Sequence, residues 1–134
     1  MDSRPFTDVT GWWEVSTKFE HTSYKPFENL TVIYQIYFQQ NGNEVIANGE
    51  KQFDQPAGRA RQDTAHTPIH LDGIFKGRSL QATFEEEGAR RKTTGDFLLT
   101  VSSDGNTLKG DFHSAGAGAS GTVLATRMKS DPTH

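Results

Sequence analysis

Hydrophobic and polar side chains alternate along much of this chain with a period of two residues. Between residues 11 and 20, Trp13, Val15, Thr17 and Phe19 share one face, and mainly charged side chains occupy the other. Such alternation is typical of a β-strand that buries one face and exposes the other. The same pattern recurs between turn signals and predicts strands at residues 11–20, 29–40, 44–53, 68–76, 79–87, 90–102, 107–114 and 121–128.

Short turn sequences connect most of these predicted strands. Residues 41–43 contain Asn-Gly and residues 104–105 are Asp-Gly, two pairs that readily adopt the backbone of a tight hairpin. Longer connections are predicted at 21–27 and at 54–67, the second of which is the best candidate for a mobile loop. Consecutive hairpins favour an up-and-down order, and eight such strands can close on themselves without leaving an exposed edge. The predicted fold is therefore all-β, an eight-stranded antiparallel up-and-down β-barrel, with a β-sandwich as the alternative.

Five glycines interrupt the predicted strands at Gly49, Gly73, Gly95, Gly110 and Gly121, mostly on the apolar face. A glycine inside a strand weakens pairing and often marks a bulge or a sharply coiled corner. Small barrels need such corners in order to close. The glycines therefore support a strongly curved sheet.

The composition fits one small domain. With 134 residues the chain is expected to form a single domain over 1–134, with a core over about 9–129 and a disordered tail over 130–134. The absence of cysteine excludes disulfides and thiolate metal sites. A net charge of −3 creates no field that attracts a nucleic-acid polymer or an acidic membrane, so neither is an expected partner.

The expected location is the cytoplasm. The first residues lack the apolar segment of a signal peptide. No run of residues approaches the roughly 18 apolar positions that a membrane-spanning helix needs.

The predicted first strand opens on Gly11-Trp12-Trp13, and the predicted last strand carries Arg127. A Gly-x-Trp opening and an arginine near the end of the last strand resemble the lipocalin-like (calycin) and avidin-like barrels. The resemblance implies that Trp13 and Arg127 form a structural plug at the closed end, with the guanidinium stacked on the indole. It covers the topology of nearly the whole chain but few residues, and the residues that avidins use for biotin cannot be mapped.

The predicted interior is rich in aromatic side chains. An eight-stranded barrel is just wide enough to be filled by side chains or to hold one small ligand. The candidate ligand-binding residues are Tyr34, Phe38, Phe53, Phe84, Phe97 and Phe112. Aromatic walls with a few polar groups are typical of ligand pockets, but a packed core has the same composition, so both interpretations stay open.

Charged residues supply candidates at the barrel mouth. Arg59, Arg61 and His66 give the long predicted loop a positive character that suits a phosphate or a carboxylate, although a solvated loop has the same composition. Residues 85–87 are three glutamates and residues 90–92 are basic, so they are expected to oppose each other across a solvated hairpin.

The outer face of the predicted strands and the histidines bear on two further kinds of site. Ile33 and Tyr37 share the outer face of one strand, which makes that face a candidate homodimer interface. The five histidines show no metal-binding spacing, so no metal site is predicted.

The leading hypothesis is a cytosolic barrel that binds an apolar or amphipathic small molecule in its interior, without a cofactor. The first alternative is a cofactor-free isomerase or cyclase that uses the same cavity, which a buried polar pair, such as Tyr with Glu, would favour. The second is a sensor of a nucleotide-like signal through Arg59, Arg61 or Lys51. No hydrolase, metalloprotease or dinucleotide motif is present, so catalysis is the less favoured class.

Overall fold

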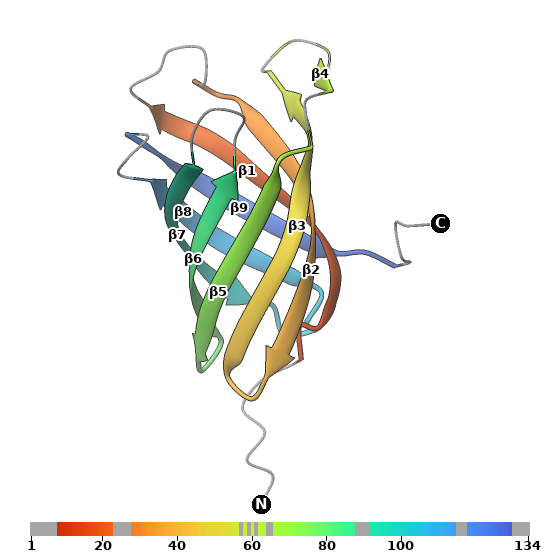
Figure 1. The fold of residues 1–134 in the computed structure, drawn as a ribbon. Coiled ribbons are helices and arrows are strands. Elements are labelled where there is room, and N and C mark those ends of the chain that lie inside the picture. Colours follow the sequence, from red (N-terminus) through yellow and green to blue (C-terminus); the bar gives the residue numbers. More distant parts are fainter. Residues whose placement is uncertain are drawn as a thin grey trace, which may run out of the picture.

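A computed structural model of the protein (Figure 1) describes residues 8–22, 28–56, 58, 60, 62–63, 66–87, 92–114 and 118–129. Its strands are β1 (Gly11–Thr22), β2 (Thr31–Asn41), β3 (Glu44–Gln55), β4 (Gln62–Asp63), β5 (Pro68–Lys76), β6 (Ser79–Glu87), β7 (Lys92–Val101), β8 (Thr107–Ser114) and β9 (Ala119–Arg127). The described residues include no helix, and hence none able to span a membrane.

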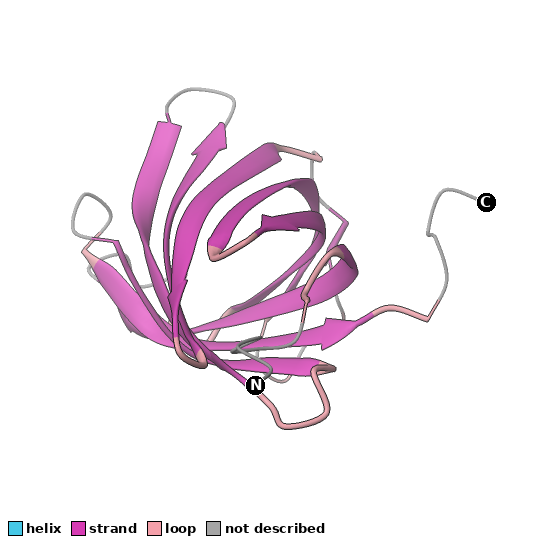
Figure 2. Cartoon of the chain, turned by 90° about the horizontal axis from the view of Figure 1, so that it is seen from below, coloured by secondary structure: helices cyan, strands magenta, loops and turns pink. Residues whose placement is uncertain are grey.

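Eight of these strands form the predicted closed barrel. They pair in the order β2-β1-β9-β8-β7-β6-β5-β3, and a further pairing of β2 with β3 closes the ring that Figure 2 shows from below. Neighbouring strands are antiparallel throughout, and most are consecutive in the chain. The short strand β4 lies outside this ring and pairs with the end of β3 at Phe53 and Asp54.

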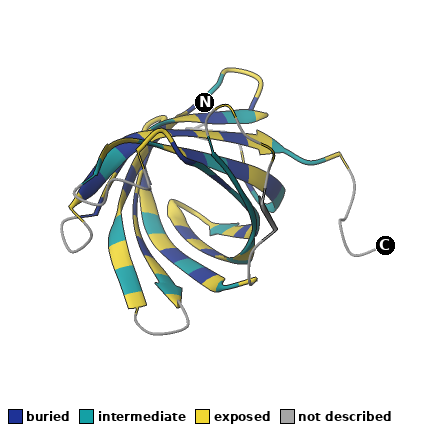
Figure 3. Cartoon of the chain, turned by 90° about the horizontal axis from the view of Figure 1, so that it is seen from above, coloured by how far each residue is buried: buried dark blue, intermediate teal, exposed yellow. Residues whose placement is uncertain are grey.

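The alternation in the sequence becomes an inner and an outer face. Figure 3 shows buried and exposed residues alternating along the strands, because successive side chains of a strand point to opposite sides. One continuous cluster of buried side chains lines the inner side, with Trp13, Ile36, Ala47, Leu80 and Ala125 completely buried. The fold is thus one sheet whose apolar face has been wrapped around its own core.

The strand glycines lie on the inner side, where neighbouring backbones come close together. Gly110 pairs with Leu99, and a Cβ atom placed on Gly110 would lie only 1.8 Å from the carbonyl oxygen of Leu98. Gly121 is equally crowded, since its Cβ would lie 1.8 Å from the carbonyl oxygen of Lys18. These contacts explain why a side chain is missing at corners of the coiled sheet.

Trp13 closes one end of the barrel and is completely buried. The guanidinium carbon of Arg127 lies 4.8 Å from the centre of the Trp13 ring, so the predicted contact between the two residues is present. Arg127 also donates hydrogen bonds to the carbonyl oxygens of Thr10 (2.9 Å), Asp8 (2.9 Å) and Gly105 (3.0 Å). We call this arrangement the end cap.

Several predicted boundaries were wrong by one or two residues. Strand β1 continues through Thr22, beyond the predicted end at residue 20, because a shift of register after Phe19 lets it keep pairing with β9. Strand β9 begins at Ala119, two residues before the predicted start. The predicted disordered tail at 130–134 lies outside the described residues.

The interior position predicted for Phe53 was wrong. A β-bulge makes Tyr34 pair with Lys51 and its neighbour Ile33 pair with Phe53, so that Gln52 is an extra residue. Phe53 therefore shares the outer face with Ile33. The same shift brings Asp54 to the inner face of β3, where Lys51 already lies.

Candidate functional site

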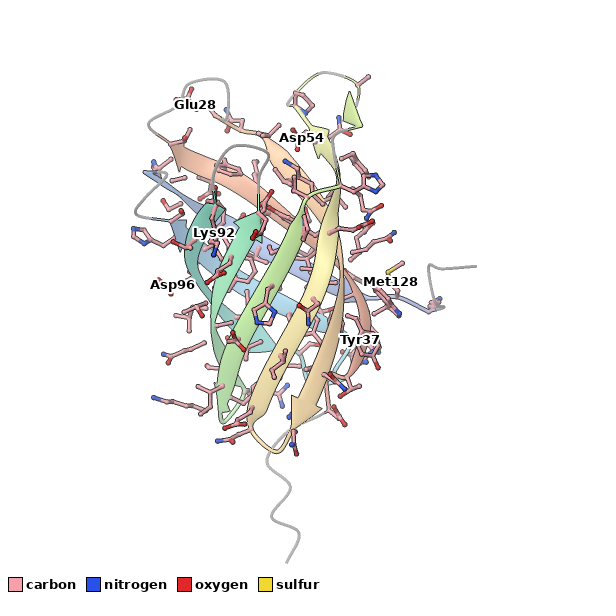
Figure 4. All side chains as sticks on the ribbon, viewed as in Figure 1. Glu28, Tyr37, Asp54, Lys92, Asp96 and Met128 are labelled. Carbon is pink, nitrogen blue, oxygen red and sulfur yellow. The ribbon has the colours of Figure 1, made fainter. Side chains whose placement is uncertain are left out.

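The end of the barrel opposite the end cap carries polar side chains on its inner side. We call this end the mouth: strands β2, β5, β7 and β9 begin there, and the other four barrel strands end there. Figure 4 shows Asp54 at this end, close to β4. The polar side chains that meet there, named here the mouth cluster, are Tyr34, Lys51, Asp54, Thr67 and Glu86.

The backbone explains how three strands contribute to the mouth cluster. Tyr34 lies between buried Val32 and Ile36 on β2, so the pleat directs it inward. Glu86 follows Phe84 on the inner face of β6. Lys51 continues the inner series of Val45 and Ala47 on β3, and the bulge after it turns Asp54 inward as well, although two residues separate them.

The strongest contact in the mouth cluster joins Tyr34 to Glu86. The Tyr34 hydroxyl donates a hydrogen bond of 2.7 Å to Oε1 of Glu86. The second oxygen, Oε2, accepts a hydrogen bond of 2.9 Å from Thr67 and lies 3.7 Å from the ammonium of Lys51. Burial, together with the nearby negative charge of Glu86, raises the pKa of Tyr34 well above its ordinary value of 10.0. Tyr34 is therefore a neutral hydrogen-bond donor at physiological pH.

Asp54 is the group in the mouth cluster whose bonding is incomplete. Its Oδ1 atom is buried and finds no hydrogen-bond donor among the described residues. The ammonium of Lys51 lies 3.9 Å away, which is ion-pair rather than hydrogen-bond distance. Burial raises the pKa of the Asp54 carboxyl above its ordinary value of 3.8; Lys51 opposes this shift and the charge of Glu86 adds to it. A buried acceptor without a donor is rare in proteins and calls for an explanation.

Aromatic rings extend from the mouth cluster into the barrel. Phe84 and Phe97 pack with their ring centres 4.9 Å apart, and Phe19 meets Phe112 edge-on at 5.1 Å. Phe38 lies farther in, 5.8 Å from Trp13 of the end cap. Of the predicted ligand-binding residues, Tyr34, Phe38, Phe84, Phe97 and Phe112 are buried on the inner side, and Phe53 is not.

The predicted mouth loop is described only in part. His66 is exposed, and its Nδ1 lies 3.1 Å from Oε1 of Glu50. Glu50 pairs with Gln35 on the outer face of β2, so His66 is bonded away from the mouth cluster. Arg59 and Arg61 lie outside the described residues.

The outer face near the predicted interface is partly covered. Tyr37 is 37% exposed and packs edge-on against Trp12, with ring centres 5.4 Å apart. Ile33 is half-buried and pairs with Phe53. The outer face around Ile33 and Tyr37 therefore exposes less apolar area than the alternation alone suggested. The homodimer stays a prediction.

The glutamate run divides between the two faces of the hairpin. Glu85 points outward and pairs with Lys92 at 3.4 Å, in keeping with the predicted solvated hairpin. That interpretation does not extend to Glu86, which faces inward. The signal was present in the sequence, because Glu86 continues the even-numbered series of Leu80, Ala82 and Phe84. Because three glutamates are consecutive, all three were predicted to be solvated.

A shallow hollow of about 590 Å³ lies on the outer surface over β5, β6 and β7. Its outward-facing lining residues include the apolar Ile74 and Leu98 and the acidic Asp72 and Asp96. Figure 4 labels Asp96 on this side of the barrel. The hollow is separate from the mouth cluster, because its outward residues lie on the opposite face of the sheet.

The mouth cluster has the chemistry of a recognition site. It presents hydroxyl, carboxylate and ammonium groups beside aromatic rings, which suits a molecule with a polar and an apolar part. Within the described residues, no three His, Asp or Glu side chains come together in a way that could hold a metal ion. No protein-family model matches the sequence, and the curated proteins searched include no match to it.

Proposed function

We propose that this protein binds one small amphipathic molecule inside its barrel. The apolar part of the ligand lies among Phe84, Phe97 and Phe112, and its polar group lies at the mouth cluster. The observation that carries the proposal is the buried Oδ1 of Asp54, at the end of the barrel away from the end cap, for which the described residues supply no hydrogen-bond donor.

The energetics of the mouth cluster support this proposal. Burying charged groups costs free energy that their mutual attraction seldom repays in full. Apolar side chains at Lys51, Asp54 and Glu86 would close the barrel at lower cost. A ligand that supplies the missing donor offsets this cost, so the mouth cluster gains its full bonding only when the ligand is bound.

The test compares two tyrosines on the same strand. Tyr34→Phe removes the inner hydroxyl, and Tyr37→Phe makes the same change on the outer face. Dodecanol, dodecylamine and dodecanoate are titrated below their aggregation concentrations by calorimetry, and native mass spectrometry reports the stoichiometry. We expect at least one to bind one-to-one, about tenfold more weakly to Tyr34→Phe and unchanged to Tyr37→Phe.

Two results would overturn the proposal. One is that none of the three compounds binds to the wild-type protein. The other is that they bind without fixed stoichiometry, or bind equally well to both tyrosine variants. Near-ultraviolet circular dichroism shows whether Tyr34→Phe keeps the native packing, so that a loss of binding is not mistaken for unfolding.

A second candidate function is proton transfer within a bound substrate, because Asp54 combines a raised pKa with an oxygen that receives no hydrogen bond from the described part of the chain. In such an isomerase Asp54 takes a proton from one carbon and returns it to another, without a cofactor. Glu86 is less suited to this role, since both its oxygens already accept hydrogen bonds.

The isomerase candidate has its own test. A β,γ-unsaturated ketone is incubated with the protein in heavy water, and deuterium entering carbon positions is followed by nuclear magnetic resonance. Catalysed exchange that disappears in Asp54→Asn supports the candidate. Exchange at the same rate in both proteins, or no exchange above the buffer rate, rules it out for this ketone class and leaves binding alone.

A further inference from the structure

The charges of the mouth cluster do not balance. Asp54 and Glu86 carry carboxyl groups, and Lys51 carries the single ammonium among the five residues of the mouth cluster. That ammonium lies 3.7 Å from Oε2 of Glu86 and 3.9 Å from Oδ1 of Asp54. Both distances exceed those of hydrogen bonds, so Lys51 is shared between two acids and completes the bonding of neither.

Glu86 and Asp54 differ in how far their hydrogen bonding is satisfied. Glu86 accepts hydrogen bonds from Tyr34 and Thr67. Asp54 has a buried oxygen for which the described residues supply no donor. The missing partner must therefore donate a hydrogen bond, and it is bound more tightly if it also brings positive charge.

We propose that the ligand of this barrel is a cationic amphiphile, an alkylammonium or arylammonium compound whose N–H group donates to Oδ1 of Asp54. This inference rests on the proposed function and names the chemical class of its ligand. An anionic head group would face two carboxyl groups, and a neutral hydroxyl would donate one bond but leave the excess charge uncompensated.

The aromatic surroundings suit a cation as well. Phe84 lies two residues before Glu86 on the same inner face, and Tyr34 bonds directly to Glu86. The faces of aromatic rings attract ammonium groups, and more strongly where water is excluded. The apolar tail then continues along Phe97 and Phe112 toward the end cap.

The experiment uses three ligands of equal chain length on the full-length protein. Dodecylamine, dodecanol and dodecanoate are titrated at pH 7.5 into the wild type, Asp54→Asn and Lys51→Met, with Tyr37→Phe as the outer-face control. We expect dodecylamine to bind at least tenfold more tightly than dodecanol, and dodecanoate to bind most weakly. In Asp54→Asn the preference for the amine over the alcohol should fall about tenfold.

Lys51→Met tests the charge argument in the opposite direction. Removing the resident ammonium leaves two carboxyl groups without a cation, so dodecylamine should bind several-fold more tightly and dodecanoate more weakly still. A variant that lost only packing would weaken all three ligands together. If Lys51→Met does not fold, the comparison in Asp54→Asn remains decisive.

The outcomes separate this inference from the proposed function. If none of the three compounds binds, the proposed function fails. If dodecanol or dodecanoate binds as tightly as dodecylamine, the barrel binds amphiphiles but the cationic class is wrong. A preference for dodecanoate that disappears in the double variant Arg59→Ala and Arg61→Ala would also overturn the inference, and would assign head-group recognition to those two arginines.

Discussion

Asp54 occupies its inner position because of one extra residue. The bulge at Gln52 lets Lys51 and Asp54 face the interior together and sends Phe53 outward. A strand without the bulge would have placed Phe53 inside and Asp54 in solvent. The bulge thus replaces the favourable burial of the Phe53 ring with the unfavourable burial of the Asp54 carboxyl. Departures of this kind from the rules of stable folding are usual at functional sites.

Replacing Asp54 by Asn should stabilise the protein at neutral pH. The pKa of Asp54 is raised above its ordinary value of 3.8 in the folded chain, so folding binds this proton more tightly. The favourable contribution is complete below that ordinary value and is lost as pH rises through the raised pKa. Because solvent screens this half-buried group, we expect a gain of a few tenths to about 1 kcal/mol at pH 7.5.

Urea denaturation of both proteins at pH 7.5 and pH 4.5 measures this gain. The advantage of Asp54→Asn should shrink at the lower pH, where more of the wild-type carboxyl is protonated. A variant that is less stable than the wild type at pH 7.5 would show that the ion pair with Lys51 outweighs the cost of burial.

The sequence predicted the site only in part. Alternation identified the inner positions of Tyr34, Phe84 and Phe112, because each lies on a regular strand. It could not join Tyr34 to Glu86, since 52 residues separate them and their contact depends on how the sheet coils. It also could not locate the bulge, because nothing in the local sequence marks Gln52 as the extra residue.

At the level of the strands, the inner glycines set how tightly the sheet can bend. Gly110 lies where its backbone almost touches the carbonyl of Leu98, so even a methyl group has no space there. Gly42 serves a different purpose, because it adopts a φ of +65° in the turn between β2 and β3 with open space around it.

The two glycines should respond very differently to alanine. Gly110→Ala must push β7 and β8 apart, and we expect a loss of about 3 kcal/mol or a failure to fold. Gly42→Ala meets only backbone strain, which costs about 1 kcal/mol. Urea unfolding monitored by tryptophan fluorescence compares them, and equal losses would contradict the close approach at Gly110.

Strand positions were predictable wherever alternation is regular. All eight predicted strands begin and end within two residues of their observed bounds, because tight turns such as Asn41–Gly42 fix them. The strand predicted from residue 90 is observed only from Lys92, since residues 88–91 lie outside the described part. Strand β4 was missed, because two residues are too few to show any period.

For the molecule as a whole, the end cap ties the two termini of the barrel together. Arg127 on the last strand bonds to Asp8 and Thr10, which precede the first strand, and also covers Trp13. A planar guanidinium can serve several carbonyls and an aromatic face at the same time, which a lysine ammonium cannot.

Arg127→Met should therefore lower the stability of the entire barrel. Three carbonyl oxygens lose their donor and Trp13 loses its cation, for an expected cost of about 3 kcal/mol and a fall in Tm of roughly 10 °C. The stability of Arg127→Lys should lie between those of the wild type and Arg127→Met, because lysine keeps the positive charge but lacks the planar guanidinium. Differential scanning calorimetry measures both, and an unchanged Tm in Arg127→Met would show that the end cap is dispensable.

The end cap also limits how long a ligand of the proposed kind can be. If the barrel binds an amphiphile as proposed, the closed end requires the ligand to enter tail first through the mouth and to leave the same way. Phe38 lies four positions after Tyr34 on β2, a span of about 13 Å along the strand. Each added methylene should contribute about 0.8 kcal/mol to binding until the tail reaches that depth, and nothing afterwards. A homologous series of amines should therefore show an affinity that rises and then levels off, which would make this barrel selective for chain length.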